Sequence, residues 1–194
     1  MRRVFIDAGC NNGDSIKAFL EGKVFKVEDP FSFEIYAFDV SDFSSQIEKV
    51  FTSQKLAGAF YQKAIWINDG KISFNFTKDN SVTTTADEFS EGHKRLPRLT
   101  TDTKYVESVD FSKWIKNNFS PSDYILLKMD IEGSEFRVLP KMIIEGTMRY
   151  IKSVRVEFHD RFLLYPRKQR EILKPIRKYV INYCKENKIP IRKW

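Results

Sequence analysis

The sequence predicts an α/β fold built on a mostly parallel, doubly wound sheet. Three observations indicate this class: strand-like runs alternate with segments of helical spacing, most of these runs are apolar almost throughout, and the first ends in a glycine-bearing turn. Strands that are apolar on both faces are typical of parallel sheets covered by helices on each side. With 194 residues the chain is long enough for a substantial core, and we expect residues 1–194 to form one domain.

Six short runs have the composition of strands, with many β-branched and aromatic residues. They are residues 3–8, 33–38, 60–67, 71–76, 124–129 and 153–158. The third and fourth runs are separated by Asn68-Asp69-Gly70, a sequence typical of hairpin turns. We therefore expect these two strands to pair with each other.

Helical spacing of apolar residues predicts five helices between and after these runs. They cover residues 14–20, 41–53, 111–118, 135–144 and 166–187. Pro166 suits the first turn of the last helix, because its missing N–H has no partner there in any case. Pro175 lies inside the same helix and should kink or split it.

Residues 80–104 interrupt this alternation, because they are polar and show no clear period. They include Gly92 and Pro97, and a loop of this length in a compact domain usually has a function. We expect a mobile lid or an acceptor-binding segment, in which Arg95 and Arg98 contact an anionic part of the acceptor.

The positive charge is concentrated near the C-terminal end. Residues 161–194 contain eleven basic residues and two glutamates, so this basic segment carries a charge of +9 and the rest of the chain −2, which gives the net charge of +7. Such a segment attracts anions, including nucleic acid, diphosphate-linked substrates and membrane head groups. A solvated outer face of a helix explains the same pattern equally well.

Three further features of the sequence indicate the cellular compartment of the protein. No apolar stretch approaches the ~20 residues that a membrane helix needs, and no signal peptide is recognisable. Cys10 and Cys184 are far apart and too few for a disulfide framework, which suits a reducing compartment. We therefore expect a cytoplasmic protein.

The turn after the first strand, D-A-G-C-N-N-G at residues 7–13, indicates a ligand site. In open parallel sheets, ligands bind at the carboxyl ends of strands where the strand order reverses. The turn lacks the lysine of a phosphate loop and the middle glycine of a dinucleotide fingerprint. An acidic residue followed by spaced glycines fits S-adenosylmethionine instead, since the sulfonium and ammonium of this ligand are cationic. A glycine-bearing turn without any ligand is the alternative.

Asp39, at the end of the second strand, is placed to accept hydrogen bonds from the ribose hydroxyls of such a ligand. The alternative is a helix N-cap, a role that Ser41 fills equally well. The remaining contacts of the ligand are expected from the turn itself and the start of the following helix: Asp7, Gly9, Asn11, Gly13 and Ser15.

The densest group of charges surrounds the end of the fifth strand. Lys128, Asp130, Glu132 and Glu135 lie within a few residues of one another. Charged residues are rarely fully buried without partners, so this density indicates a site. Lys128 and Asp130 have the same parity on the strand and should point to the same side. As an alternative, the two glutamates merely start a helix.

Five segments resemble, in order, the motifs of the FkbM-type family of S-adenosylmethionine-dependent methyltransferases. They are FIDAGCNNGDS, YAFD, KAIWINDGKISF, LLKMDIEGSEFRVL and VRVEFH, and they span residues 4–159. The K-x-D-x-E-G-x-E part is the most specific. The resemblance implies a Rossmann-like class I methyltransferase domain that methylates a hydroxyl of a sugar, a glycan or a secondary metabolite. It also implies that Ala64, in the third motif, contributes to cofactor binding.

The chain departs from the family pattern in three ways. Asp39 stands where a glutamate is more usual, no helix precedes the first strand, and only residues 188–194 follow the last helix, where a closing hairpin is usual. We therefore expect a domain truncated at both ends, either a compact version or one domain of a longer glycan-modifying protein.

Methyl transfer to a hydroxyl requires removal of its proton, because an alcohol is a poor nucleophile. Asp130 and His159 follow neighbouring predicted strands and are the candidate bases, since a histidine titrates near neutral pH. Glu132 and Glu157 lie beside them, and Lys128 would tune their charge. Alternatively, Asp130, Glu157 and His159, with or without Glu132, hold a divalent metal ion that acidifies the hydroxyl. A structural role for His159 is the third reading.

Two other functions remain open from the sequence. The basic segment suits an RNA ribose 2′-O-methyltransferase, but that chemistry commonly uses a lysine before the first strand, where this sequence has Met1, Arg2 and Arg3. A non-catalytic nucleotide- or glycan-binding module is the other. The crowded carboxylates favour an enzyme over such a module, and we expect a sugar or glycan acceptor, with nucleic acid as the second choice.

Overall fold

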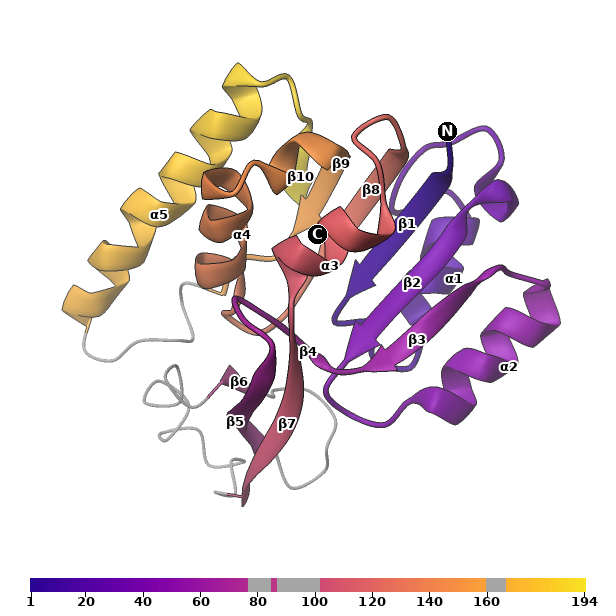
Figure 1. The fold of residues 1–194 in the computed structure, drawn as a ribbon, viewed down its shortest axis with the longest axis horizontal. Coiled ribbons are helices and arrows are strands. Elements are labelled where there is room, and N and C mark those ends of the chain that lie inside the picture. The colour runs from indigo at the N-terminus through magenta and orange to yellow at the C-terminus, as the bar shows by residue number, and fades with distance from the viewer. Residues whose placement is uncertain (77–84, 87–101, 160–166) are drawn as a thin grey trace.

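The fold is that of an α/β protein with two sheets (Figure 1). In the computed structural model, the described residues are 1–76, 85–86, 102–159 and 167–194. The larger sheet is six-stranded and every pairing in it is parallel. The predicted fold class is confirmed.

The larger sheet has the order β10-β9-β8-β1-β2-β3. Its strands are β1 (Arg3–Ala8), β2 (Glu34–Asp39), β3 (Gly58–Gln62), β8 (Tyr124–Met129), β9 (Ile151–Val156) and β10 (Ile191–Lys193). The chain builds one half outward from β1 to β3 and the other half outward from β8 to β10. The strand order therefore reverses between β1 and β8, which is where such sheets bind ligands.

Helices cover both faces of this sheet. One face carries α1 (Asp14–Leu20) and α2 (Ser44–Gln54); the other carries α3 (Phe111–Asn118), α4 (Glu135–Ile144) and α5 (Arg167–Glu186). Two 3-10 helices, η1 (Pro30–Ser32) and η3 (Thr147–Tyr150), precede β2 and β9. The predicted helices are confirmed, although α5 is one continuous helix through Pro175. Pro175 is exposed there, so the carbonyl that loses its partner can turn to water.

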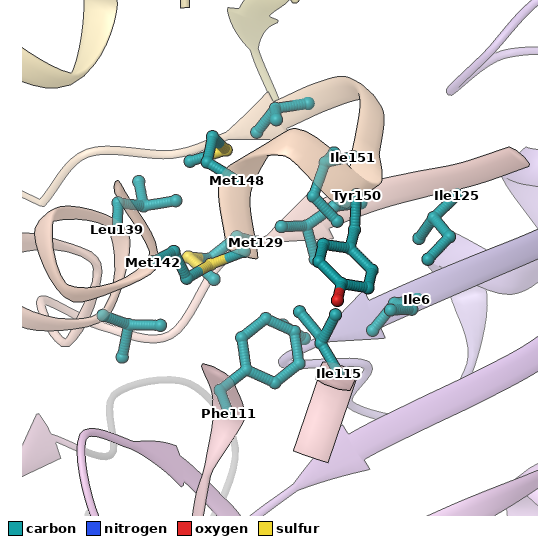
Figure 2. Packing of buried hydrophobic residues seen from close by; sticks show 14 of the residues in the cluster. Ile6, Phe111, Ile115, Ile125, Met129, Leu139, Met142, Met148, Tyr150 and Ile151 are labelled. Carbon is teal, nitrogen blue, oxygen red and sulfur yellow. The ribbon is translucent and has the colours of Figure 1, made fainter. Parts of the chain in front are cut away.

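Alternation along the strands divides the core between the two faces. Phe5 packs with the helices on the α1 side, while Ile6 belongs to the larger core beneath α3 and α4. Figure 2 shows this larger core, in which Phe111 and Ile115 of α3 face side chains of the sheet and of α4. Each fully buried side chain of this size contributes about 1.5–3 kcal/mol to folding. These two cores fix the strand ends that carry the polar residues.

The smaller sheet has the order β4-β7-β5-β6, and the predicted hairpin is wrong. Its strands are β4 (Ala64–Trp66), β5 (Gly70–Phe76), β6 (Thr85–Ala86) and β7 (Asp102–Asp110). β7 lies between β4 and β5, parallel to the first and antiparallel to the second. The Asp69 carboxylate accepts the N–H of Asp110 at 3.0 Å, and the Ser108 hydroxyl donates to the Asn68 carbonyl at 3.0 Å. The turn between β4 and β5 is thus hydrogen-bonded to the end of β7, which lies between these two strands, and it does not close a two-stranded hairpin.

Most of the predicted lid lies outside the described residues, and so do Arg95 and Arg98. Within the span 80–104, Thr85–Ala86 forms β6 and residues 102–104 begin β7. These two pieces belong to the smaller sheet, so the prediction of an unbroken loop is wrong there.

The C-terminal residues form a parallel edge strand and not a closing hairpin. β10 pairs with β9, and the N–H of Trp194 donates to the carbonyl of Val156 at 3.1 Å. In the described part of the basic segment, the cationic side chains with a described exposure lie on the surface: Lys174, Arg177, Lys178, Lys185, Lys188, Arg192 and Lys193. Among the described helices, none combines the length and apolar character of a membrane span.

Candidate functional site

The turn after β1 joins the two halves of the sheet. Gly9 has φ +80°, and a Cβ on it would lie 1.9 Å from the carbonyl oxygen of Asp130. The N–H groups of Gly9 and Cys10 donate to the carbonyl of Phe38 at 2.9 and 3.0 Å. Gly9 therefore permits close contact between the ends of β1, β2 and β8. Gly13 has φ +87° and packs against Ile47 of α2.

Asp39 organises the end of β2. Its carboxylate accepts the N–H of Asn11 and the N–H of Ser41, each at 2.9 Å. Burial raises the pKa of Asp39, while these two hydrogen bonds lower it in part. The alternative of a helix N-cap is wrong, since α2 has Phe43 at its N-cap. Each carboxylate oxygen has two lone pairs and has used one, so Asp39 can accept two more hydrogen bonds.

A buried charge network lies behind the turn. Lys128 Nζ donates to the Gly9 carbonyl at 2.6 Å and lies 3.3 Å from Asp7 Oδ1 and 3.6 Å from Asp130 Oδ2. The Ser15 hydroxyl donates to Asp7 Oδ2 at 2.5 Å. Burial lowers the pKa of Lys128, but the charges of Asp7 and Asp130 outweigh it and the net shift is upward. Lys128 is therefore cationic, and it faces Asp130 as the strand parity predicts.

His159 sits among three carboxylates that follow β8. Its Nδ1 lies 2.8 Å from Glu135 Oε1, and its Nε2 lies 3.5 Å from both Asp130 Oδ1 and Glu132 Oε2. Glu135, in the first turn of α4, is fully buried and also accepts the N–H of Ile131 at 3.0 Å. Because β8 and β9 are neighbours, Asp130 and His159 meet as the sequence predicts.

The electrostatics of this group differ from those of an ordinary histidine. Burial lowers the pKa of His159, but the hydrogen bond to Glu135 and the charges of Glu135, Glu132 and Asp130 raise it to about 9. Burial raises the pKa of Glu132 to about 8, against the pull of His159. At neutral pH the imidazole of the ligand-free site is thus protonated. The expectation that His159 titrates near neutrality is wrong for this state.

Glu157 is outside the group of ligand atoms around His159, although its charge acts on Glu132. Its N–H donates to the carbonyl of Met129 at 3.0 Å, and it lines a different pocket together with Phe158, Arg177 and Arg192. Among the residues that the structure describes, a set with ligand atoms all within 4.8 Å of one another is Asp130, Glu132 and His159. In the predicted metal set, Glu132 therefore takes the place of Glu157.

One pocket, open to solvent, lies where the strand order reverses. Figure 1 shows the smaller sheet beside the ends of β1 and β2, and it contributes to the lining. We call Gly9, Asn11 and Asp39 the turn side of this pocket, and Asp130 and Glu132, with Glu135 and His159 behind them, the charged side. The full lining is Gly9, Asn11, Phe38, Asp39, Val40, Ser41, Phe43, Lys63, Ala64, Ile65, Phe74, Asp130, Ile131, Glu132 and Ser134.

The pocket brings together half of the predicted site residues. Gly9, Asn11, Asp39, Ala64, Asp130 and Glu132 line it. Of the others, Asp7, Ser15 and Lys128 lie in the buried charge network, and Gly13 packs against α2. His159 lies behind Asp130 and Glu132, and Glu157 lines the other pocket.

Sequence reasoning counted Glu135 in the group of charges that indicates a site but gave it no catalytic, binding or metal-ligand role. The available signal was its position as the last charge of K-x-D-x-E-G-x-E, but an acidic residue at a helix start has an ordinary explanation. Lys63, the first residue of the third motif, and Phe43, which lies outside the motifs, also line the pocket, and the sequence analysis gave neither a role.

The fold is that of a Rossmann-like α/β protein with a pocket at the reversal of its strand order, where such sheets bind ligands. The family model of the Methyltransferase FkbM domain matches residues 6–180, most of the chain. The protein therefore belongs to the FkbM family of methyltransferases, as its motifs predict. No curated protein and no solved structure matches the chain.

Proposed function

We propose that the protein is an S-adenosylmethionine-dependent O-methyltransferase that acts on a hydroxyl of a sugar or glycan. One observation carries the proposal: a single pocket has a carboxylate with spare acceptor capacity on its turn side and a carboxylate–imidazole group on its charged side. The first suits a ribose, and the second suits activation of a hydroxyl.

The residues of the turn side fit the cofactor. Asp39 can accept hydrogen bonds from both ribose hydroxyls, because its contacts to Asn11 and Ser41 leave lone pairs unused. Phe43, Ile65 and Phe74 line the same pocket and offer apolar surface to a flat heterocycle. When bound, S-adenosylmethionine supplies an electrophilic methyl group, and the chain has to position the acceptor and remove its proton.

The charged side suits that task. The acceptor oxygen must come within ~3–3.5 Å of the methyl carbon and lose its proton. Asp130 and Glu132 line the pocket, and burial raises the pKa of Glu132 to about 8, so this carboxyl group can gain or lose a proton near neutral pH. Two routes are open: these groups take the proton themselves, or they hold a cation that acidifies the hydroxyl. The buried Lys128 offsets part of their negative charge in either case.

A neutral, hydroxylated acceptor fits the charged side of the pocket better than a polyanion does. Sugar hydroxyls can donate to Asp130 and Glu132, whereas RNA phosphates would be repelled by them. The RNA reading commonly uses two lysines, whereas Lys128 is buried and held by Gly9 and Asp7, and Lys63 is a lysine that lines the pocket. Arg2 is bound to Glu34 and to the carbonyl of Asn118.

Incubation with S-adenosylmethionine carrying a labelled methyl group, followed by mass spectrometry of sugars, glycans and RNA, tests the proposal. We expect label on a sugar hydroxyl, lost with Asp130→Asn and kept with the exposed control Glu48→Gln. Label on RNA ribose would favour the RNA alternative. Binding of the demethylated cofactor, S-adenosylhomocysteine, with no transfer to any acceptor would favour the non-catalytic module.

A further inference from the structure

The charged side has the geometry of a metal centre. Asp130 Oδ1 and Glu132 Oε2 each lie 3.5 Å from His159 Nε2, and the ligand atoms of the three residues are all within 4.8 Å of one another. In an octahedral site with bonds near 2.1 Å, adjacent ligands are about 3 Å apart. A small inward movement of the two carboxylates is therefore enough to enclose an ion.

His159 is held in the orientation of a metal ligand. Its Nδ1 contacts Glu135 at 2.8 Å, which leaves Nε2 on the side of Asp130 and Glu132. Metal-bound histidines almost always give their other ring N–H to a carboxylate or a carbonyl. Glu135 is itself fixed by the N–H of Ile131 and by its place in α4, so the ligand set is supported from behind.

An independent feature, the side chain of Ser134, indicates a ligand at the charged side of the pocket. Ser134 lines the pocket next to Asp130 and Glu132, and it is only 1% exposed. Its hydroxyl has no hydrogen-bond partner among the described residues. Buried hydroxyls nearly always have one, so a partner is expected from something bound in the pocket, such as a coordinated water or an acceptor hydroxyl.

We propose that Asp130, Glu132 and His159 bind a divalent cation at the charged side of the pocket. Two carboxylates and a neutral imidazole balance a charge of two, and a mixed oxygen and nitrogen set suits Mn²⁺ better than Mg²⁺, which prefers oxygen alone. Because two of the ligands line the pocket, the positions left open face the acceptor.

A bound ion would also determine which class of acceptor the enzyme takes, and this inference about the acceptor rests on the proposed function. Adjacent open positions can hold two neighbouring hydroxyls of a sugar, so the acceptor is a vicinal diol. A hydroxyl held beside the ion would release its proton to solvent, and its oxygen would bond to the methyl carbon as the carbon–sulfur bond breaks. The products are the methyl ether, S-adenosylhomocysteine and one proton, so atoms and charge balance.

Calorimetric titration of chelator-treated protein with MnCl₂ alone, with no cofactor or acceptor present, tests the site. We expect one ion per chain and at least tenfold weaker binding in Glu132→Gln and in His159→Gln. Glu157→Gln and the exposed control Glu48→Gln should bind within about twofold of the parent. Circular dichroism of each variant checks that it is folded.

No Mn²⁺ binding up to millimolar concentration, or an equal loss in Glu157→Gln and Glu132→Gln, would overturn the proposal. A parallel titration with S-adenosylhomocysteine keeps the two proposals apart. Cofactor binding without Mn²⁺ binding refutes the metal site alone. Mn²⁺ binding without cofactor binding or methyl transfer keeps the site and refutes the function.

Discussion

The two sides of the pocket are built by different means. On the turn side, Asp39 is held by the backbone N–H groups of Asn11 and Ser41, in loops shaped by unusual backbone conformations. On the charged side, Glu132, Glu135 and His159 are strongly shielded from solvent and shift one another's pKa values. Buried, mutually perturbed groups are costly to keep and are typical of catalytic sites. We therefore propose that the turn side binds the cofactor and that the charged side carries the chemistry.

The largest effect is expected where the two sides meet. Gly9→Ala places a Cβ 1.9 Å from the backbone carbonyl of Asp130, so the strand ends must separate. We expect a loss of more than about 4 kcal/mol in the free energy of unfolding, measured by urea denaturation, or no soluble protein. Gly22→Ala is the matched control, because Gly22 also has positive φ but nothing within 4 Å of an added Cβ. It should cost about 1–2 kcal/mol. Equal losses would mean that the two sides are not in contact here.

Removing charge from the charged side should abolish most turnover. Asp130→Asn keeps the shape of the side chain but loses its basicity and its charge. We expect a turnover number lower by about 10²–10⁴-fold at saturating cofactor, measured with labelled methyl groups. Affinity for S-adenosylhomocysteine should stay within about threefold of the parent. A variant that instead lost cofactor affinity and kept its turnover would reverse the roles of the two sides.

Glu135 should have a smaller effect, since it acts through His159. In Glu135→Gln the hydrogen bond to Nδ1 can persist, but the carboxylate that raises the pKa of His159 is gone. We expect Mn²⁺ affinity lower by about 10–100-fold and a pH profile of binding displaced to lower pH. Glu145→Gln, at the other end of α4, is the control and should change neither. An unchanged pH profile in Glu135→Gln would show that Glu135 has only a structural role.

The smallest effect concerns stability and pH in the presence of a chelator. The pKa of His159 is about 9 in the folded protein and 6.5 in the unfolded chain. Protonation therefore stabilises the fold fully below pH 6.5, and this contribution is lost as the pH rises toward 9. Glu132, with a pKa raised to about 8, changes stability in the same direction. We expect unfolding free energy to fall by about 1–3 kcal/mol between pH 6.5 and 9, with a flatter curve in His159→Gln. Stability that rose over this range would contradict the assignment.

Periodicity and composition were enough to predict most of the fold, because the spacing of apolar residues indicates which faces of the strands and helices are buried. β7 was missed because polar and apolar residues are mixed along it, and its pairing with β4 and β5 depends on distant segments. The same omission produced the false hairpin, since a turn of the right composition says nothing about a strand inserted between its arms.

For the site, the sequence identified the strand ends but not the directions of their side chains. Asp7 and Ser15 belong to the recognised motif yet bind each other and Lys128 behind the pocket. Glu132 reaches His159 from a backbone with φ +51°, a conformation that a non-glycine residue rarely adopts and that no pattern announces. Glu157 looked equally suitable because it lies two residues before His159 in the chain, yet it lines the other pocket.

The division between binding and chemistry is tested most directly by calorimetry with S-adenosylhomocysteine on the parent, Asp39→Ala and His159→Gln. Loss of hydrogen bonds to a carboxylate costs about 1.5–3 kcal/mol, so Asp39→Ala should bind at least tenfold more weakly than the parent. His159→Gln should bind within about threefold of it, with one cofactor per chain. The account is contradicted if the parent does not bind S-adenosylhomocysteine, or if His159→Gln loses as much affinity as Asp39→Ala.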